Sequence, residues 1–258
     1  MQYLTPLLTK RVIRNMQIFE NDLNAVFVRH GYNLRDNLGR RNALLSQAQE
    51  KEVARALRTI YKNVIDDGAP GKPDVQIVDI NKELECKLSS GSGKSKTFSL
   101  QTDYITLTKK GSLDYLYILT SPDFTGFCVL FFQGLTIDDF FPPGKGSRGK
   151  SRMNKALGMK KCKILHGKAI NINRRNIVKY AIRRDVKKIE RKARFAELIK
   201  ELKATPSNDR TKKRKIMDMC RFEIKRFRKA IKKFDDKMQL WMGKPDSFSF
   251  KLLPLENI

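Results

Sequence analysis

Hydrophobic residues recur every three to four positions in two stretches near the start of the chain. The first stretch lies near residues 3–19 and the second spans residues 42–64. The apolar positions of the second are Leu45, Ala48, Val53, Ala56, Leu57, Ile60 and Val64. This period places apolar side chains on one face of a helix. The pattern therefore predicts two amphipathic helices.

The pattern then changes to short runs that are rich in β-branched and aromatic residues. A turn-forming segment, DDGAPGK, leads into runs at residues 74–80, 82–89, 97–108, 114–121 and 127–135. Such runs are typical of strands. Helices followed by several strands predict an α/β or α+β fold, with a mixed central sheet flanked by helices.

Two longer helical patterns lie near the end of the chain, at residues 173–203 and 211–241. The first stripe consists of Ile182, Val186, Ile189, Ala193, Ala196 and Ile199. The second consists of Ile216, Cys220, Ile224, Phe227, Ile231, Phe234, Met238 and Trp241. The turn sequence TPSNDR separates the two helices. We expect the two stripes to pack together as a helical hairpin, with Lys and Arg on the outer faces.

Charge is distributed unevenly along the 258 residues, which carry a net charge of +27. Residues 1–141 hold 18 Lys+Arg and 16 Asp+Glu, whereas residues 142–258 hold 36 and 11. The change falls at the Pro- and Gly-containing sequence FPPGKGSRGK. We therefore predict a nearly neutral core with N-terminal helices at residues 1–141, and a basic linker with a helical region at 142–258. The positive electrostatic field of the basic residues attracts polyanions, of which nucleic acid is the most common in a cell.

Composition also argues against several classes of protein. No apolar run is long enough to span a bilayer and the N-terminus lacks a signal-peptide layout, so we expect a soluble, cytoplasmic protein without a membrane partner. Four dispersed cysteines form no CxxC pair, which argues against structural zinc. His30 and His166 are the two histidines, which argues against a His-centred nuclease or a Ser/His/Asp triad.

Candidate chemistry lies in PDVQIVDINKELECKLS at residues 73–89. Side chains two apart in a strand share a face, so Glu85 and Lys87 lie together opposite the apolar positions of their strand. If the two runs form a hairpin, its short connection brings Asp74 near Glu85. Two carboxylates suit Mg²⁺, and a neighbouring lysine can orient water or stabilise charge on a phosphate.

Pro73-Asp74, ten intervening residues and then Glu85-Cys86-Lys87 resemble the motif of the PD-(D/E)xK nucleases. This superfamily includes most type II restriction endonucleases, and the resemblance covers roughly residues 42–133. It implies a restriction-endonuclease-like fold with Asp74 and Glu85 as Mg²⁺ ligands and Lys87 as the catalytic lysine. It also implies a homodimer that cuts a short palindromic site in double-stranded DNA.

Many members of the superfamily add an acidic residue from the preceding helix, and Glu50 and Glu52 are the candidates here. Glu52 shares a helical track with Ala48, Ala56 and Ile60, so it borders the apolar face. We therefore expect Glu52 to be the additional catalytic residue and Glu50 to be solvated, although a plain surface carboxylate is an equal alternative for Glu52.

Two Gly-containing segments carry basic residues that could contact DNA. SSGSGKSK, at residues 89–96, contains Lys94 and Lys96, and it lacks the first glycine of a phosphate-binding loop, so we expect no nucleotide cofactor. GKGSRGKSR, at residues 144–152, is interpreted as either a DNA-embracing arm or a solvated linker. Its basic residues are Lys145, Arg148, Lys150 and Arg152.

The functional hypothesis is a Mg²⁺-dependent endonuclease for double-stranded DNA, acting as a type II restriction enzyme. A junction-resolving, repair, recombination or homing nuclease with the same core is the first alternative. The second is a non-catalytic, basic nucleic-acid-binding protein in which Glu85 and Lys87 are surface charges.

Overall fold

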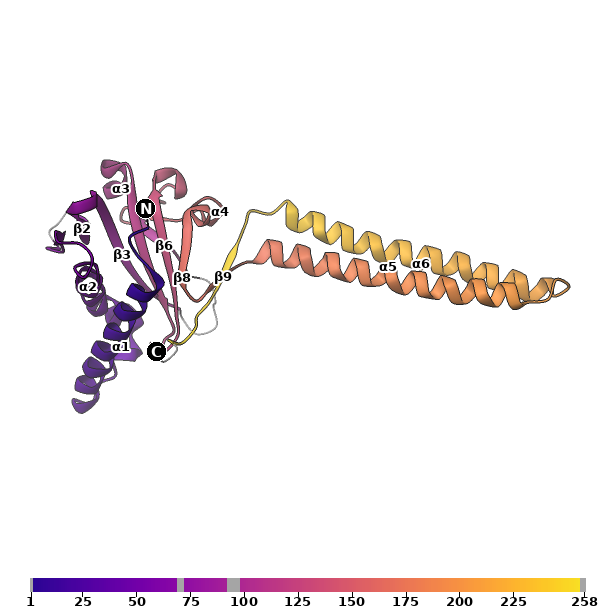
Figure 1. The fold of residues 1–258 in the computed structure, drawn as a ribbon, viewed down its shortest axis with the longest axis horizontal. Coiled ribbons are helices and arrows are strands. Elements are labelled where there is room, and N and C mark those ends of the chain that lie inside the picture. The colour runs from indigo at the N-terminus through magenta and orange to yellow at the C-terminus, as the bar shows by residue number, and fades with distance from the viewer. Residues whose placement is uncertain (1, 69–71, 92–97, 256–258) are drawn as a thin grey trace. The chain divides into compact units, whose positions relative to one another are not determined.

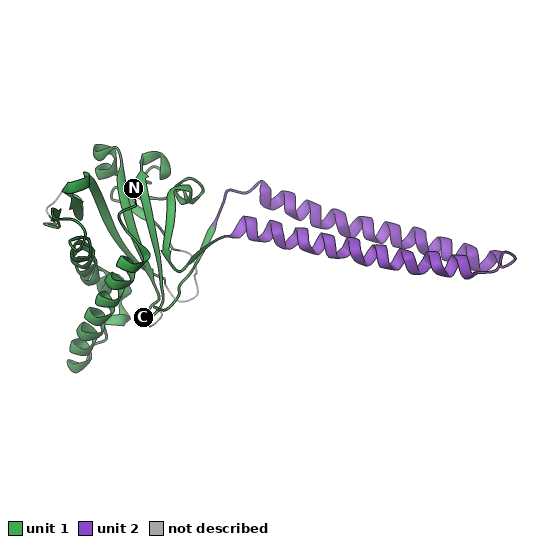
Figure 2. Cartoon of the chain, viewed as in Figure 1, with its two compact units in different colours: residues 1–170, 248–258 green, residues 171–247 purple. Residues whose placement is uncertain are grey.

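A computed structural model describes residues 2–68, 72–91 and 98–255. The chain forms two compact units: residues 1–170 with 248–258, and residues 171–247 (Figure 2). The predicted division at residue 141 is therefore wrong. The Pro- and Gly-containing segment is not a linker, because the chain after it returns to the first unit and adds strands there.

The first unit contains a six-stranded sheet among the described residues, in the order β1-β2-β3-β5-β6-β8 (Figure 1). The parallel pair is β3 with β5, and the other neighbours are antiparallel. The strands are β1 (Val64–Ile65), β2 (Val75–Ile77), β3 (Lys82–Ser90), β5 (Leu113–Thr120), β6 (Phe127–Leu135) and β8 (Cys162–His166). The predicted mixed α/β class, with a central mixed sheet flanked by helices, is confirmed.

Shorter elements complete this unit. Two further strand pairs are β4 (Gln101–Asp103) with β7 (Lys150–Arg152), and β9 (Lys168–Asn171) with β10 (Phe248–Lys251). The α-helices are α1 (Pro6–Arg29), α2 (Leu38–Leu57), α3 (Tyr104–Lys110) and α4 (Lys155–Gly158). The 3₁₀ turns are η1 (Leu34–Asp36), η2 (Val78–Ile80), η3 (Ile137–Asp139) and η4 (Met159–Lys161).

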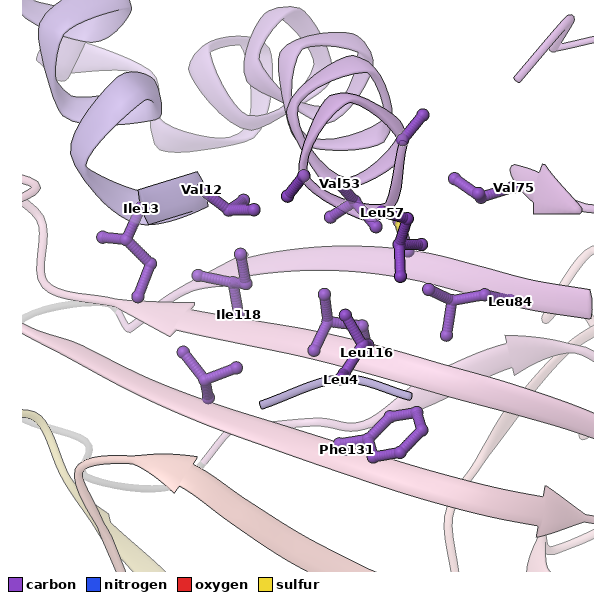
Figure 3. Packing of buried hydrophobic residues seen from close by; sticks show 14 of the residues in the cluster. Leu4, Val12, Ile13, Val53, Leu57, Val75, Leu84, Leu116, Ile118 and Phe131 are labelled. Atoms are coloured by element: carbon purple, nitrogen blue, oxygen red, sulfur yellow. The ribbon is translucent and has the colours of Figure 1, made fainter. Parts of the chain in front are cut away.

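The sheet buries apolar side chains on both faces. Alternation along β5 places Leu116 and Ile118 in the core beneath α1 and α2 (Figure 3), while Tyr115 and Tyr117 join a second core on the opposite face. Every residue of β5 is buried, as expected for a strand covered on both sides. These two cores fix which face of each neighbouring strand is available for chemistry.

The second helix ends earlier than its apolar pattern predicts. The α2 helix stops at Leu57, and Val64 belongs to β1 instead. Arg58 helps to hold this change of direction, because its side chain donates to the carbonyl of Val64 at 3.0 Å. The last two positions of the apolar pattern therefore lie outside the helix.

One predicted strand is largely a helix. Within residues 97–108, Gln101–Asp103 forms β4, but Tyr104 begins α3. The Asp103 side chain accepts from the backbone N–H of Thr106 at 2.8 Å and so caps the helix. Gly111 ends it at a positive φ of 74°, which glycine adopts readily. These caps outweigh the strand preference of the intervening β-branched residues.

The second unit is a helical hairpin of α5 (Ile172–Ala204) and α6 (Arg210–Met242), which agrees with the predicted helices to within a residue at each end. On α6 the predicted stripe packs inward, since Ile216, Phe227 and Met238 are buried. On α5 the predicted packing face is wrong. Its stripe is exposed to solvent, whereas Leu198 on the other side of the helix is buried.

No helix among the described residues is long and apolar enough to cross a membrane.

Candidate functional site

The alternation of β3 exposes two charged residues on one face. Leu84 and Cys86 are buried in the core beneath α1 and α2. Glu85 and Lys87 therefore point to the opposite face of the sheet, in register with Tyr115 and Tyr117 of β5. The predicted orientation of these residues agrees with the structure.

Asp74 lies where β2 begins, next to this charged pair. Val75 pairs with Leu84, so the residue before Val75 lies beside Glu85 across the antiparallel ladder. The Asp74 carboxylate accepts a hydrogen bond from the backbone N–H of Cys86 at 2.7 Å. The Asp74 side chain thus supplies a hydrogen-bond acceptor to β3 at a position just outside the β2 strand.

Lys87 joins the two carboxylates. Its Nζ lies 2.8 Å from Glu85 Oε2 and 3.6 Å from Asp74 Oδ2. Burial alone lowers the pKa of Lys87, but the negative charges of Glu85 and Asp74 outweigh burial and raise it above the usual value. The lysine is therefore an ammonium, and the three predicted residues form one cluster.

Glu50, and not the favoured Glu52, lies beside this cluster. Burial, followed by the negative charge of Asp74, raises the pKa of Glu50 to about 7. Glu52 instead accepts from Asn15 at 2.6 Å and pairs with Arg55 at 2.6 Å. The apolar pattern of α2 correctly predicts that Glu52 lies at the edge of the packed face of the helix. Glu52 faces Asn15 of α1, however, and not the cluster. The rotation of α2 about its axis directs Glu50 to the cluster instead.

A cleft of about 320 Å³ opens next to Lys87. It is lined by Lys87, Leu88, Ser89, Ser99, Gln101, Thr102, Asp103, Tyr117 and Lys150. The β4–β7 pair forms one wall and brings Asp103 opposite Lys150. The negative charge of Asp103 also contributes to a raised pKa at Glu85, after burial and Asp74. Asp103 lies inside the run at residues 97–108 that the sequence predicts as a strand, and nothing in that pattern marks it as a site residue.

The basic residues that we predicted to contact DNA are placed differently from one another. Lys94 and Lys96 lie outside the described residues. Lys145 and Arg148 are exposed in the turn before β7, while Lys150 and Arg152 are part of β7 itself. Lys150 alone of the described four lines the cleft with Lys87.

The donor set fits a hard divalent cation. In the described ranges no three His, Cys, Asp or Glu side chains are close enough to hold an ion by themselves. Mg²⁺ keeps several waters, however, and is commonly held by one or two carboxylates. Asp74, Glu85 and Glu50 are three acidic groups against the single Lys87 ammonium, and burial together with the charge of Asp74 raises the pKa of Glu50. Asp74 and Glu85 would hold the ion.

The helical hairpin carries a second, strongly basic surface. Residues 171–247 hold 26 Lys+Arg and 10 Asp+Glu, a net charge of +16. The solvent-exposed face of α6 contains seven basic residues: Lys215, Lys225, Arg226, Lys229, Lys232, Lys233 and Lys237. A shallow hollow runs along part of this face, between Arg226 and Lys237. Such a row of cations suits a phosphate backbone.

Comparisons with protein-family models, with curated proteins and with solved structures find no match to this chain.

Proposed function

We propose that the protein is a Mg²⁺-dependent endonuclease that hydrolyses phosphodiester bonds of double-stranded DNA. The observation that carries this proposal is the meeting of Asp74 and Glu85 at Lys87, beside a cleft with a second lysine. A solvated Glu–Lys pair would not need a third charged residue from another strand, nor a fourth from a helix.

The residues of the cluster have different chemical roles in this proposal. Asp74 and Glu85 would hold Mg²⁺, which when bound polarises a phosphate oxygen and lowers the pKa of its water. Lys87 is a protonated donor, so it orients the attacking water and stabilises the charge that develops on the phosphate. Lys150 adds positive charge to the same cleft and attracts the DNA backbone.

The α6 face supplies sequence-independent affinity. Lysines and arginines that neutralise phosphates release counterions, and this release dominates non-specific DNA binding. Within the proposal, the hairpin holds DNA of any sequence, while discrimination between sequences belongs to residues that reach base edges.

A restriction endonuclease that acts on a short palindrome as a homodimer is the form of the activity that we propose. Two copies of one active site, related by a two-fold axis, match the two strands of a palindromic duplex. The products of cleavage distinguish a restriction enzyme from another endonuclease of the same class.

Incubation of supercoiled plasmid with and without Mg²⁺ tests the proposal. The wild type should cut only with Mg²⁺, Lys87→Ala should not cut, and Ser89→Ala, two residues along the same strand face, should cut almost normally. Discrete fragments support a restriction enzyme, whereas a smear indicates a non-specific or repair nuclease. Plasmid that is bound but uncut under all conditions would indicate a non-catalytic binding protein.

A further inference from the structure

The outer face of α5 carries an apolar stripe that the hairpin leaves uncovered. Ile182, Val186 and Ile189 are 59%, 48% and 68% exposed, and Ala193 and Ala196 after them are also exposed. Leu198, which is buried, comes nine residues after Ile189, about two and a half helical turns. The stripe therefore faces almost directly away from the side of α5 that packs in the hairpin.

The spacing of the stripe is that of a coiled-coil seam. Its residues follow one another at steps of four, three, four and three: Ile182, Val186, Ile189, Ala193 and Ala196. This alternation is the heptad pattern by which one helix packs against another. The α6-facing side of α5 includes Arg184, which pairs with Asp235 at 3.3 Å. Tyr180, Phe195 and Leu198 also lie on that side, so both faces of α5 are apolar and the outer one has no partner within the hairpin.

Charged residues beside the stripe favour a second copy of the same helix in antiparallel orientation. Arg183, Glu190 and Glu197 recur at seven-residue intervals along one flank, so the flank is basic at its start and acidic towards its end. An antiparallel copy of the same helix places the basic part of one flank against the acidic part of the other. Arg183 then faces Glu197 of the second copy, in both symmetry-related halves.

Side-chain size fits the same arrangement. In a heptad, Val186 and Ala193 occupy a positions, and Ile189 and Ala196 occupy d positions. Antiparallel helices pair a with d, so Ile189 lies opposite Ala193 of the second copy, and Val186 lies opposite Ala196. Two large side chains therefore oppose two small ones, and Ile182 lies opposite Lys200 at the end of the seam. Glu190 approaches its own symmetry mate near the axis, where Lys187 of the same helix pairs with it.

Like charge opposes this contact, because α5 itself holds 12 Lys+Arg and 4 Asp+Glu. The stripe lies on the side of α5 that faces away from α6, so an α5–α5 contact leaves both α6 helices outward. Repulsion between them is also screened, because the Debye length is about 8 Å at physiological ionic strength.

We propose that two copies of this chain associate through the α5 stripe, as an antiparallel pair of helices that places the two α6 faces outward. This inference gives the homodimer of the proposed function an interface, and it stands without the nuclease chemistry. The stripe, from Ile182 to Ala196, extends over about 21 Å of helix at 1.5 Å per residue.

Sedimentation of the full chain, free of DNA and Mg²⁺ and in 0.5 M salt, measures the association directly. We expect a wild-type dimer at micromolar concentration. Ile189→Glu should be a folded monomer, because a charge in the centre of the seam cannot be paired there. Phe222→Glu is the matched control, since Phe222 is 66% exposed on the outer face of α6 and should leave the dimer intact. Circular dichroism should show unchanged helix content in both variants.

A charge-reversal cycle tests the direction of the helices. Arg183→Glu should weaken the dimer several-fold, up to about tenfold because the pair occurs twice, and adding Glu197→Arg should restore it. A wild type that stays monomeric at 100 µM, or a dimer that survives Ile189→Glu, would overturn the proposal. If Arg183→Glu leaves the dimer affinity unchanged, the antiparallel pairing is wrong. Cleavage assays report separately on the nuclease chemistry, so the two proposals can fail independently.

Discussion

The carboxylate of Asp74 accepts a hydrogen bond from the backbone N–H of Cys86, at the centre of the Glu85-Cys86-Lys87 tripeptide. This bond ties the start of β2 to the middle of β3, so the acidic residue is placed by the fold and not by its own rotamer preference alone. The same oxygen lies 3.6 Å from Lys87 Nζ. One atom therefore serves both the strand ladder and the charged cluster.

Substitutions at Asp74 should separate these two roles. Asp74→Asn keeps an oxygen that accepts from Cys86, so the protein should remain folded while Mg²⁺ affinity and cleavage fall sharply. Asp74→Ala leaves the Cys86 N–H without its acceptor and should cost about 1–3 kcal/mol in the free energy of unfolding. Urea denaturation and calorimetric titration with Mg²⁺ measure the two effects. Equal stability of the two variants would contradict the structural role.

Glu50 should make the metal-free protein less stable as pH rises. Its pKa is about 7 in the folded protein, above the usual 4.5, so the folded state holds the proton more tightly. Stability therefore declines between about pH 4.5 and 7, and the loss is complete above pH 7. Glu50→Gln should be neutral at pH 4 and stabilising at pH 8 by about 1 kcal/mol, a value reduced for solvent screening of a partly exposed group.

Urea denaturation in EDTA across this pH range measures the difference between wild type and Glu50→Gln. The matched control is Glu52→Gln, two residues away and outside the cluster, which should show no such rise towards pH 8. If Mg²⁺ is then added at pH 8, wild type should gain stability relative to Glu50→Gln, because the cation offsets the negative charge.

The sequence predicts the cluster but not its full membership. Period-two alternation in β3 fixes the faces of Glu85 and Lys87, and a short connection fixes the approach of Asp74, so local rules are sufficient for these residues. The choice between Glu50 and Glu52 depends on how α2 is rotated against the sheet. That rotation is set by distant contacts, such as the one between Asn15 and Glu52, and no local pattern contains it.

The same limit explains the two errors in the second half of the chain. Sustained 3.6-residue periodicity predicts the ends of α5 and α6 well. However, an apolar stripe does not say which helix covers it, and the stripe at Ile189 remains exposed. Likewise, a jump in charge after residue 141 does not mark a domain boundary. Antiparallel pairing of β8 with β6, in which Ile164 lies opposite Leu130, keeps the following segment in the first unit.

The buried acid Glu20 should be important for stability. It is 1% exposed, pairs with Arg35 at 2.8 Å and lies 3.8 Å from the fully buried Arg41. Glu20→Gln leaves the Arg41 guanidinium buried without a compensating charge and should cost about 3 kcal/mol in unfolding free energy. Asp218→Asn removes one partner of an exposed pair with Arg221 and should change stability by less than about 0.5 kcal/mol. Chemical denaturation compares the two variants.

Neutralising a lysine on α6 should flatten the salt dependence of DNA binding. Lys229 lies on the outer face of α6, so Lys229→Ala should reduce the slope of log K against log salt by about 1 for one lost phosphate contact. Lys192→Ala removes the same charge beside the α5 stripe and should leave the slope nearly unchanged. Fluorescence anisotropy in EDTA, over several salt concentrations, measures both slopes. A similar change in both variants would favour general attraction over a binding face.

Lys150 should matter more to cleavage than its basic neighbours in the same segment. It lines the cleft with Lys87, whereas Lys145 is exposed in the preceding turn. Lys150→Ala should lower the cleavage rate constant at saturating enzyme roughly tenfold, equivalent to about 1.4 kcal/mol of transition-state stabilisation, because a cation near the reacting phosphate is lost. Lys145→Ala makes the same change in net charge but should lower the rate less than about twofold, through long-range attraction alone. Single-turnover cleavage at saturating enzyme removes the contribution of affinity. If the two variants then cut at the same rate, Lys150 acts only by attracting DNA, and the cleft at Lys87 does not hold the scissile phosphate.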